Sequence, residues 1–470
     1  MQGKISFGTD GWRSRLDSGF TAENVRRVAF AIAAHILESG STGRGVFIGY
    51  DGRAHSKGFA EECARVLACK GIPSYLPPGP LPTPVAAFSA VRYSLAGSIM
   101  ITASHNPPEY NGIKFIPEYG GPAMPDVTNG IESRIPAEPP AVTEAASSGL
   151  ISELDPYEDY LRHLRGLVKC DLSGLRIVLD PMHGATAGYA SRIFSEMGAE
   201  VEAVRGKIDP LFGGTIPDPT PENLSGLRSK VIASGSDMGI AFDGDGDRIA
   251  AVTRDGVFLA VNQLLPILYL HLMERRSMVG DAARTVATSH LVDRVADDHG
   301  QKVIEVPVGF KYIGVLLREN AVVIGGEESG GMSFLNHIPE KDGIASAAIL
   351  MEAVKSSGQS LGGLYNGLIS KYGRLCSARL DLRASFGGDI MRLIEGGAAA
   401  KREILRRRVA GVNRKDGIKI MLEDGSWILF RKSGTENVVR IYAESGEDAL
   451  TADLLSYGKS LVLVSYETEF

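Results

Sequence analysis

Three aspartates in the segment DGDGDR, at 243–248, are the residues of this sequence best suited to bind a metal ion. Asp243, Asp245 and Asp247 alternate with glycine, so their carboxylates can turn toward one point in an extended or looping backbone. Like charges packed this densely are costly without a cation. Hard carboxylate oxygens suit a divalent ion, and Mg²⁺ is the first candidate. The segment is therefore predicted to bind Mg²⁺.

Two other interpretations of this segment need comparison. An EF-hand calcium loop is excluded, because the sixth loop position is Arg248 instead of glycine and the twelfth is Arg254 instead of glutamate. A purely structural turn of aspartate and glycine stays open, although its clustered charge would then lack a partner.

A serine in an unusual setting lies in the segment TASHNP at 102–107. Ser104 follows an apolar run and precedes His105, Asn106 and two prolines, which would hold its hydroxyl rigidly at the start of a loop. The segment lacks the GxSxG pattern of a hydrolase. A serine alone in such a place is more often a turn-former. Together with a cation-binding segment, Ser104 becomes a candidate phosphoryl carrier.

A lysine follows this serine on the next predicted strand, in the segment NGIKF. An amine near a metal ion and a phosphate could have a lowered pKa, which would allow Lys114 to shuttle protons. On local sequence alone, an ordinary surface lysine is the competing interpretation.

Two further loops carry groups suited to a sugar phosphate. GEESGG at 326–331 offers Glu327 and Ser329, whose carboxylate and hydroxyl suit the vicinal hydroxyls of a sugar, although a simple acidic loop is the alternative. RKSGTEN at 431–437 could cradle a phosphate through a guanidinium, hydroxyls and backbone N–H groups. Its candidate phosphate ligands are Arg431, Ser433, Gly434, Thr435 and Asn437.

The elements that must position these loops follow an α/β pattern. Short runs rich in valine and isoleucine alternate with amphipathic helical stretches, which is typical of a parallel sheet covered by helices. The predicted strands include 45–51, 98–104, 176–180, 237–243 and 321–327, and the predicted helices include 22–39, 56–70, 189–197 and 289–299.

The same order of strand, helix and strand recurs three times, and each closing strand opens into one of the polar loops at 102–107, 243–248 and 326–331. Ligands of open α/β sheets bind beyond the carboxyl ends of the strands, so these loops could converge on one cleft. After about Arg374 the sequence changes to short strands and two helices, which predicts a smaller α+β unit. The predicted domains are 1–150, 151–253, 254–372 and 373–470, with a helix starting at Ile151.

The charge, the cysteines and the apolar stretches of the sequence indicate which kinds of partner and which cellular location to expect. The 470 residues carry 50 Lys plus Arg against 56 Asp plus Glu, and this balance argues against nucleic acid as a main partner. The four cysteines form no CxxC pair and no zinc spacing, so they are expected to be reduced thiols. No secretory signal is recognisable, and the most apolar stretch is too short for a membrane helix. A soluble, cytoplasmic protein without membrane partners is predicted.

Five short motifs, in their order along the chain, resemble the α-D-phosphohexomutase family: FGTDGWR at 7–13, TASHNP, DGDGDR, GEESGG and RKSGTEN. The resemblance extends from about Phe7 to Arg440 and beyond. It implies four domains around a central cleft, three with a shared mixed α/β core and a smaller α+β domain at the C-terminus. It also implies an isomerase that moves a phosphoryl group between hexose 1-phosphate and hexose 6-phosphate, with hexose 1,6-bisphosphate as intermediate and activator.

The resemblance implies a role for each matching residue. At the reacting centre it implies that Ser104 is a phosphoserine and that Asp243, Asp245 and Asp247 bind Mg²⁺, with a phosphate oxygen on Ser104 completing the site. It also implies that Arg13 and Arg248 lie near the phosphate, that His105 is the histidine that follows the serine, and that Lys114 is an acid–base lysine. For the substrate it implies a sugar-reading pair, Glu327 and Ser329, and a site for the phosphate that is not transferring, made by Arg431, Ser433, Gly434, Thr435 and Asn437.

The choice of sugar depends on departures within the family. Bacterial phosphomannomutase/phosphoglucomutase enzymes typically end the sugar loop with histidine, whereas this sequence has Gly331, so the basic role of that histidine cannot be transferred. EES and HIPEKDG at 337–343 are similar to phosphoglucomutases, which indicates Lys341 as an alternative proton carrier. Phosphoglucosamine mutases usually show a different residue between the glutamate and the serine. Glucose phosphates are therefore the predicted substrates, with mannose phosphates or dual specificity second.

Two other classes of protein are alternatives. A haloacid-dehalogenase phosphatase would use Asp243 as nucleophile and Asp245 as acid, but Asp247 stands where that class normally has threonine or valine. A non-catalytic sugar-phosphate sensor would be expected to lose Ser104 or a metal carboxylate, and none is lost. The prediction is a phosphohexomutase, acting as a monomer or homodimer, whose mobile fourth domain closes over the substrate.

Overall fold

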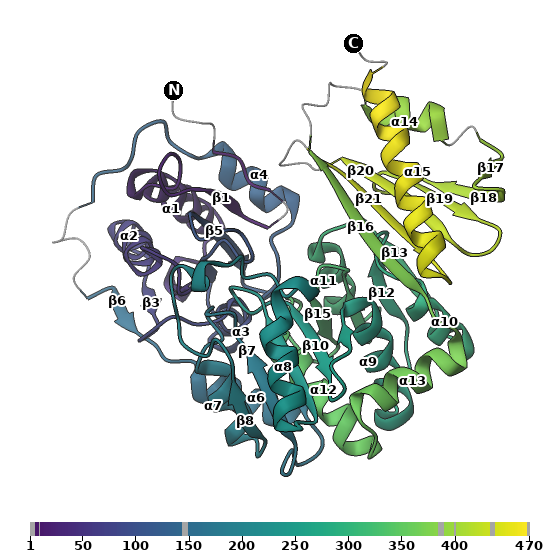
Figure 1. Cartoon of the computed structure of the whole chain (residues 1–470). Coiled ribbons are helices and arrows are strands. Elements are labelled where there is room, and N and C mark those ends of the chain that lie inside the picture. Colours follow the sequence, from purple (N-terminus) through teal and green to yellow (C-terminus); the bar gives the residue numbers. More distant parts are fainter. Residues whose placement is uncertain are drawn as a thin grey trace.

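The computed structural model describes residues 5–8, 10–142, 149–383, 390–398, 401–432 and 438–467. In this part of the chain the strands form four sheets, of six, five, four and six strands. We call each sheet with its helices a unit and number the units along the chain. In Figure 1 the first three units adjoin one another, and the fourth, in green and yellow, lies beside β12 and β13 of the third.

The first unit has a six-stranded sheet in the order β1-β5-β4-β2-β3-β6. β2 is buried at every position, and its sequence VFIGY is accordingly apolar without alternation, as expected for a strand covered on both faces. The bounds are β1 (Trp12–Arg15), β2 (Val46–Tyr50), β3 (Ser74–Leu76), β4 (Gly97–Ile101), β5 (Tyr110–Pro117), β6 (Ile151–Glu153), α1 (Ala22–Glu38), α2 (Ser56–Cys69), α3 (Thr83–Arg92) and α4 (Pro125–Ser133).

The second unit has a five-stranded sheet in the order β11-β10-β9-β7-β8, and the third has a four-stranded sheet in the order β13-β12-β14-β15. The second unit comprises α6 (Tyr157–Leu167), β7 (Arg176–Asp180), α7 (Tyr189–Glu196), β8 (Glu200–Ala203), α8 (Ser225–Ser234), β9 (Met238–Phe242), β10 (Ile249–Thr253) and β11 (Phe258–Leu259). The third comprises α9 (Val261–Arg276), β12 (Ala282–Thr285), α10 (Leu291–Asp298), β13 (Val303–Val306), α11 (Phe310–Arg318), β14 (Ile324–Gly326), β15 (Met332–Phe334), α12 (Gly343–Ser357) and α13 (Leu361–Tyr372).

One topological device recurs in these three units. A strand that runs parallel to its sheet neighbour, namely β4, β9 or β14, turns back into an antiparallel partner, namely β5, β10 or β15. The three reversals are the loops that carry Ser104, the aspartates and Glu327. Each loop therefore starts at the carboxyl end of a parallel strand, where α/β folds bind ligands. The predicted set of three similar α/β units is confirmed.

The fourth unit is antiparallel throughout its six-stranded sheet, in the order β16-β21-β20-β19-β18-β17. Its elements are β16 (Cys376–Arg383), α14 (Ile390–Ala398), β17 (Glu403–Ile404), β18 (Arg407–Asn413), β19 (Ile418–Leu422), β20 (Trp427–Lys432), β21 (Val438–Ser445) and α15 (Asp448–Glu467). The two helices lie together on this sheet in Figure 1, as predicted for a smaller α+β unit.

The start of the second unit differs from the prediction. The helix expected from Ile151 begins at Tyr157, and Ile151–Glu153 instead forms β6, which pairs in parallel with β3 of the first unit. Proline disfavours a helical residue before it, so Pro156 prevents a helix from extending back toward Ile151. The Tyr157 N–H donates a hydrogen bond to Asp155 Oδ1 at 3.0 Å, which satisfies a backbone donor at the new helix start.

The units share their cores unequally. One continuous apolar cluster runs from Phe47 of the first unit through Ile177 of the second to Leu264 of the third. The fourth unit has its own core and meets the third through a small cluster around Trp427 and through Lys419, whose Nζ donates to the Val286 carbonyl at 2.8 Å. The first three units therefore form one packed body to which the fourth is attached by a smaller contact.

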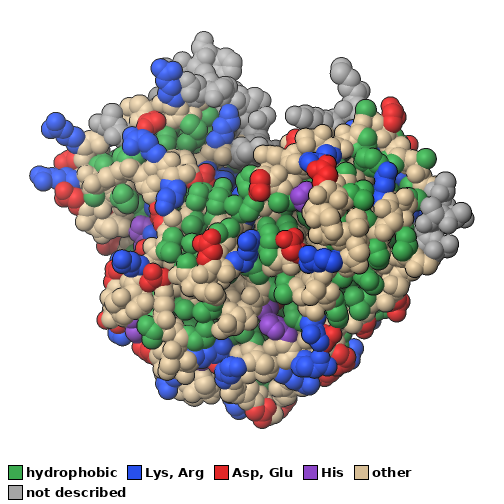
Figure 2. Space-filling model, turned by 180° about the vertical axis from the view of Figure 1, so that it is seen from behind, with side chains coloured by type: hydrophobic (Ala, Val, Ile, Leu, Met, Phe, Trp, Pro, Cys, Tyr) green, Lys and Arg blue, Asp and Glu red, His purple; other side chains and the backbone are tan. Residues whose placement is uncertain are grey.

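The surface carries mixed charge. Basic and acidic side chains are interspersed over the face shown in Figure 2, in keeping with the net charge of -6. Nucleic acid binding usually depends on a basic stripe or patch, and this face offers opposite charges side by side instead. Among the described residues, every helix is too short or too polar to cross a membrane.

A buried ion pair between α9 and α12 of the third unit also contacts the second unit. Glu352 accepts hydrogen bonds from Arg276 Nε at 2.7 Å and from the Lys169 N–H at 2.8 Å, and its Oε1 lies 3.0 Å from His271 Nε2. Burial opposes the negative charge, but the hydrogen bonds from His271, Arg276 and Lys169 outweigh burial and lower the pKa of Glu352 to about 2.

Glu352→Gln is expected to destabilise the protein by about 3 kcal/mol at neutral pH, because it leaves Arg276 buried without an opposite charge. The contribution of Glu352 is fully present above its unfolded pKa of 4.5 and is lost as the pH falls toward about 2. Thermal unfolding of both proteins between neutral pH and pH 3 should show their difference shrinking below pH 4.5. A difference that stays constant over this window would contradict the pairing.

Candidate active site

The loop between β4 and β5 presents Ser104 to the second unit. The Ser104 hydroxyl is buried and donates a hydrogen bond to Asp243 Oδ2 at 2.7 Å. Its backbone is left-handed, with φ 51°, which is uncommon for a residue other than glycine. The Ser104 N–H donates to Thr102 Oγ1 at 2.9 Å, which helps to hold this conformation. The serine predicted to carry a phosphoryl group therefore lies directly against the predicted metal ligands.

The loop between β9 and β10 brings the three aspartates together. Asp243, Asp245 and Asp247 each offer a carboxylate oxygen, and these oxygens all lie within 4.8 Å of one another. All three side chains are buried, and the Oδ1 atoms of Asp245 and Asp247 have no hydrogen-bond partner. A buried carboxylate oxygen without a partner is costly, so this cluster fits a cation that would satisfy both atoms. A purely structural turn does not explain these unpaired oxygens.

The charges of the cluster are unequal. Burial, together with the charges of Asp245 and Asp247, raises the pKa of Asp243 well above its usual value. Burial also acts against the charge of Asp245, but the Lys114 ammonium and a 2.6 Å hydrogen bond from Thr83 Oγ1 outweigh it and lower the pKa of Asp245. Asp243 is thus the carboxylate of the cluster whose negative charge its surroundings oppose most, and a bound divalent ion would relieve this.

The glycines of DGDGDR are required by close packing, of Gly244 against the first unit and of Gly246 within the second. A Cβ at Gly244 would lie 2.4 Å from the Ser104 carbonyl oxygen, and one at Gly246, where φ is 75°, would lie 2.5 Å from a Thr186 methyl carbon. Both contacts are shorter than side-chain atoms allow. The backbone of the metal loop therefore approaches the serine loop as closely as it does because Gly244 has no side chain.

Lys114 on β5 is buried, which excludes the interpretation as a surface lysine. Its Nζ lies 2.9 Å from Asp10 Oδ2, 3.1 Å from Asp245 Oδ2 and 3.3 Å from Asp247 Oδ2. Burial disfavours the ammonium charge, but these three carboxylates outweigh burial and raise its pKa. The expectation of a lowered pKa is therefore wrong, because the nearby charges are negative.

Lys341 reaches the same carboxylates from the third unit. Its Nζ lies 3.4 Å from Asp247 Oδ2 and 3.6 Å from Asp10 Oδ2, and the side chain is buried. Burial opposes its charge as well, and the charges of Asp10 and Asp247 raise its pKa. The two lysines predicted to move protons thus converge from different units, and both are protonated in this arrangement.

Two arginines flank the serine. Arg248 donates its N–H to Asp243 Oδ1 at 3.1 Å, and its Nε lies 3.7 Å from Asp247 Oδ1. Arg13 on β1 donates from Nη1 to Asn106 Oδ1 at 2.9 Å, within the serine loop. The two guanidinium groups bring positive charge near Ser104, as predicted for groups that bind a phosphate.

His105 is partly buried beside Ser104, and its Nδ1 lies 3.4 Å from the serine Oγ. Burial and the charges of Arg248 and Arg13 hold the pKa of His105 well below its usual value. The imidazole is therefore neutral and able to accept a proton from a neighbouring hydroxyl.

The loop between β14 and β15 joins the metal loop through its backbone. Gly331 forms an isolated bridge with Arg248, and the Ile249 N–H donates to the Gly330 carbonyl at 3.1 Å. Within the loop, Ser329 Oγ donates to Glu327 Oε1 at 2.7 Å, and burial raises the pKa of Glu327. The predicted sugar-reading pair is therefore preassembled beside Arg248.

A glycine at 331 makes room for Lys341. A Cβ at Gly331 would lie 2.2 Å from Lys341 Cδ and 2.6 Å from Lys341 Cγ. The aliphatic stem of Lys341 thus fills the space that a side chain at 331 would need. A histidine at this position and a lysine in this orientation are mutually exclusive, which accounts for the departure of the sequence at Gly331.

The predicted phosphate loop is only partly described. Arg431, at the end of β20, donates from Nε to Asp416 Oδ2 at 2.8 Å, and the same oxygen accepts the Val308 N–H at 2.9 Å. This pairing fixes Arg431 near the contact between the third and fourth units. The other predicted phosphate ligands, Ser433, Gly434, Thr435 and Asn437, lie outside the described residues.

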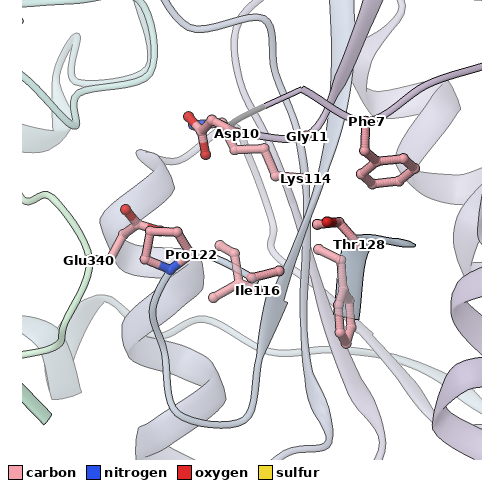
Figure 3. A pocket seen from close by; sticks show the side chains of 10 residues that line it. Phe7, Asp10, Gly11, Lys114, Ile116, Pro122, Thr128 and Glu340 are labelled. Atoms are coloured by element: carbon pink, nitrogen blue, oxygen red, sulfur yellow. The ribbon is translucent and has the colours of Figure 1, made fainter. Parts of the chain in front are cut away.

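Four residues of the site escaped the sequence analysis. Asp10 lies inside FGTDGWR and Glu340 inside HIPEKDG, so motifs already noted contained both, whereas no local pattern indicated Thr83 or Arg53. Figure 3 shows Asp10, Lys114 and Glu340 on one side of a pocket, opposite Phe7 and Thr128. Burial raises the pKa of Glu340 to about 8.

The fold and this site together define a sugar-phosphate mutase, and comparison with known proteins agrees. Residues 4–141, 156–256 and 260–372 match alpha/beta/alpha domains I, II and III of phosphoglucomutase/phosphomannomutase, and residues 393–456 match its C-terminal domain. The chain belongs to this family of α-D-phosphohexomutases and is an intramolecular phosphotransferase. This membership excludes the dehalogenase-type phosphatase.

Three similar proteins cover nearly the whole chain. Phosphoglucosamine mutase 1 of Shewanella amazonensis is 33% identical over 97% of this chain and 98% of its own length. A phosphoglucomutase/phosphomannomutase of Thermococcus kodakarensis is 28% identical over 98% of both chains. The crystal structure of a putative phosphomannomutase from Thermus thermophilus has a TM-score of 0.87, at 32% identity, and covers 98% of this chain and 100% of that one. These names differ in sugar, so membership of the family leaves the sugar to be argued separately.

Gly331→Ala is expected to lower kcat by roughly a hundredfold. The added methyl would displace Lys341 from the carboxylates by about 1 Å, and a displacement of that size in an active site lowers the rate by about this factor. Initial rates with a saturating sugar phosphate measure the effect. Gly367→Ala is the matched control, since a Cβ at that helical position meets no atom within 4 Å, and it should retain the wild-type rate. Wild-type turnover in Gly331→Ala would show that Lys341 is free to lie elsewhere.

Proposed function

We propose that this phosphohexomutase interconverts glucose 1-phosphate and glucose 6-phosphate through a phosphoserine at Ser104 and a glucose 1,6-bisphosphate intermediate. The observation that carries the proposal is the 2.7 Å hydrogen bond from the Ser104 hydroxyl to Asp243 within the buried carboxylate cluster. A serine held between a cation site and two arginines is suited to accept a phosphoryl group and to release it again.

Asp243, Asp245 and Asp247 would hold Mg²⁺, with a phosphate oxygen on Ser104 completing its ligands. When bound, Mg²⁺ supplies positive charge that stabilises the oxygens of the transferring phosphoryl group. Arg13, from the first unit, and Arg248, from the second, would bind the same oxygens.

Proton movement falls to groups already near the reacting hydroxyls. When the phosphoryl group passes from a sugar oxygen to Ser104 Oγ, the serine loses a proton, which a neutral imidazole can take, and the sugar oxygen gains one, which a lysine ammonium can supply. The reverse transfer returns both protons. The neutral His105, 3.4 Å from Ser104 Oγ, can exchange a proton with the serine. Lys341 is our candidate for exchange with the sugar, because it extends from the third unit beside the sugar loop, and Lys114 supplies charge balance.

Support for glucose comes from the sugar loop and its surroundings. Glu327 and Ser329 are hydrogen-bonded to each other and would turn to paired sugar hydroxyls. Glu328, the residue that differs in phosphoglucosamine mutases, accepts a hydrogen bond from Thr285 Oγ1 at 3.0 Å and is thereby held in the third unit. Lys341, which belongs to the segment similar to phosphoglucomutases, fills the space that a side chain at Gly331 would need.

Glucosamine phosphate is the second candidate. It is favoured by the relative from Shewanella amazonensis, which carries the name phosphoglucosamine mutase and matches 97% of this chain. Mannose phosphates, or activity on both glucose and mannose, follow from the names of the other relatives.

The phosphate that does not transfer is assigned to RKSGTEN of the fourth unit. Its arginine, Arg431, would bind that phosphate through a guanidinium fork. One distal site must accept either end of the bisphosphate as it turns over, which requires the fourth unit to move. The small contact between the third and fourth units is compatible with such movement.

Purified protein supplied with Mg²⁺ and a trace of the matching hexose 1,6-bisphosphate is expected to convert glucose 1-phosphate with a kcat/KM at least tenfold above those for mannose 1-phosphate and glucosamine 1-phosphate. Coupled assays run in parallel on the three sugars measure this. A higher kcat/KM for glucosamine 1-phosphate would replace glucose by the second candidate, and no conversion of any of the three would refute the mutase assignment.

Asp245→Asn is expected to lower kcat by roughly a hundredfold or more, because the variant weakens the cation site that stabilises the transferring phosphoryl group. Peptide mapping after treatment with glucose 1,6-bisphosphate should find an acid-stable phosphoserine at Ser104 in the wild type and much less in the variant. The assignment would be contradicted if the wild-type protein kept its full rate in excess chelator. It would also be contradicted if the phosphate were recovered on a residue other than Ser104.

A further inference from the structure

A buried arginine outside every motif of the sequence analysis holds the serine loop. Arg53 lies three residues after β2, and its side chain is fully buried. Its two terminal nitrogens donate to four main-chain carbonyls of the loop between β4 and β5: Ser104 at 2.6 Å, Asn106 at 2.6 Å, Pro107 at 2.8 Å and Tyr110 at 3.1 Å. The partners thus span the whole loop, from its serine to the first residue of β5.

The loop depends on these donors because it has few of its own. Two adjacent prolines, Pro107 and Pro108, remove two N–H groups, and Ser104 directs its N–H to a side chain. The backbone bonds within the loop run from the Asn106 N–H to Ala103 and from the Tyr110 N–H to Pro107. Buried carbonyls need partners, so the conformation with Ser104 at φ 51° is stable only while another group supplies the donors.

An ion pair and an aromatic ring contact the parts of the Arg53 guanidinium that do not face the loop. Its Nε lies 3.2 Å from Asp51 Oδ2, and Asp51 Oδ1 accepts bonds from Ser56 Oγ at 2.8 Å and the Arg53 N–H at 3.0 Å. The guanidinium carbon lies 4.7 Å from the centre of the Phe212 ring, which belongs to the second unit. The serine loop is therefore tied through one side chain to β2 and to the unit that carries the metal ligands.

The terminal donors of this guanidinium are engaged. Each terminal nitrogen carries two hydrogens and has two carbonyl acceptors, whereas Nε lies at ion-pair distance from Asp51 without a hydrogen bond. Arg53 thus has no terminal N–H group left for a phosphate. Its place beneath the loop is also fully buried, so a sugar phosphate cannot reach it.

We propose that Arg53 is a positioning residue for phosphoryl transfer, which keeps the Ser104 hydroxyl 2.7 Å from Asp243 by fixing the carbonyls of the serine loop. This inference rests on the proposed function of Ser104 as phosphoryl carrier. A lysine could not replace Arg53, because an ammonium has three donors and lacks the planar fork that serves four carbonyls at once.

The test compares Arg53→Lys and Phe212→Leu with the wild type. The fraction of protein that becomes phosphorylated on Ser104 by glucose 1,6-bisphosphate is measured first, and kcat is then expressed per phosphorylated site, which corrects for any unfolded protein. For Arg53→Lys we expect kcat per site to fall roughly a hundredfold while KM changes less than about threefold, because the serine is displaced and the substrate contacts are not. Phe212→Leu removes the ring against which the guanidinium packs and so holds Arg53 less firmly under its four carbonyls, for which a smaller fall of about three- to tenfold is expected.

The matched control is Arg44→Lys. Arg44 also donates to two main-chain carbonyls of the first unit, those of Ser94 and Leu95, but it lies away from the serine loop. This variant should keep the wild-type kcat per site. The ³¹P resonance of phosphorylated Ser104 provides an independent readout, since it should shift in Arg53→Lys and remain unchanged in Arg44→Lys.

The outcomes separate the two proposals. If the wild type never becomes phosphorylated on Ser104, the proposed function fails. If the wild type is phosphorylated but Arg53→Lys transfers at the wild-type rate per site, only the positioning role is overturned. A raised KM with unchanged kcat would also overturn it, because that result indicates contact with the substrate. Should Arg53→Lys fail to fold, an unchanged rate per site in Phe212→Leu overturns the proposal.

Discussion

Negative charge buried where three units meet is the constraint on which the rest of this structure depends. The aspartates at 243, 245 and 247 lie in the interior, where a carboxylate is stable only beside opposite charge or a strong hydrogen bond. Each unit contributes a cation that pairs with these carboxylates: Lys114 from the first, Arg248 from the second and Lys341 from the third. Holding the three units together therefore also holds the charge balance of the site.

Close backbone contact is the second consequence of this arrangement. Gly244 lies against the Ser104 carbonyl, and Gly343, at the start of α12, lies where a Cβ would be 2.8 Å from the Gly246 carbonyl oxygen. Loops from three sheets can meet this closely only where side chains are missing. The glycine content of the sequence is thus used, at these positions, to bring polar groups from separate units within hydrogen-bond distance.

Much of the fold could be predicted from the local pattern of apolar and polar residues, and the elements that were predicted wrongly have identifiable causes. The apolar runs predicted β2 and β9 because strands buried on both faces leave that signature in the sequence. The helix α6 was predicted to start at 151 but starts at 157, six residues later. Residues 151–153 form β6 instead, because they pair with β3, whose paired residues lie 77 positions earlier in the chain. A strand of three residues has too little sequence to reveal such a partner.

The sequence by itself determined which groups are available: a serine at a strand end, three carboxylates within five residues and loops at the ends of parallel strands. Only the tertiary structure decided how those groups behave. Lys114 meets Asp245 across 131 residues and Arg53 meets Ser104 across 51, and neither partnership leaves a local trace. The state of a buried charge depends on the balance between lost hydration and the charges around it, and that balance exists only once the units have packed.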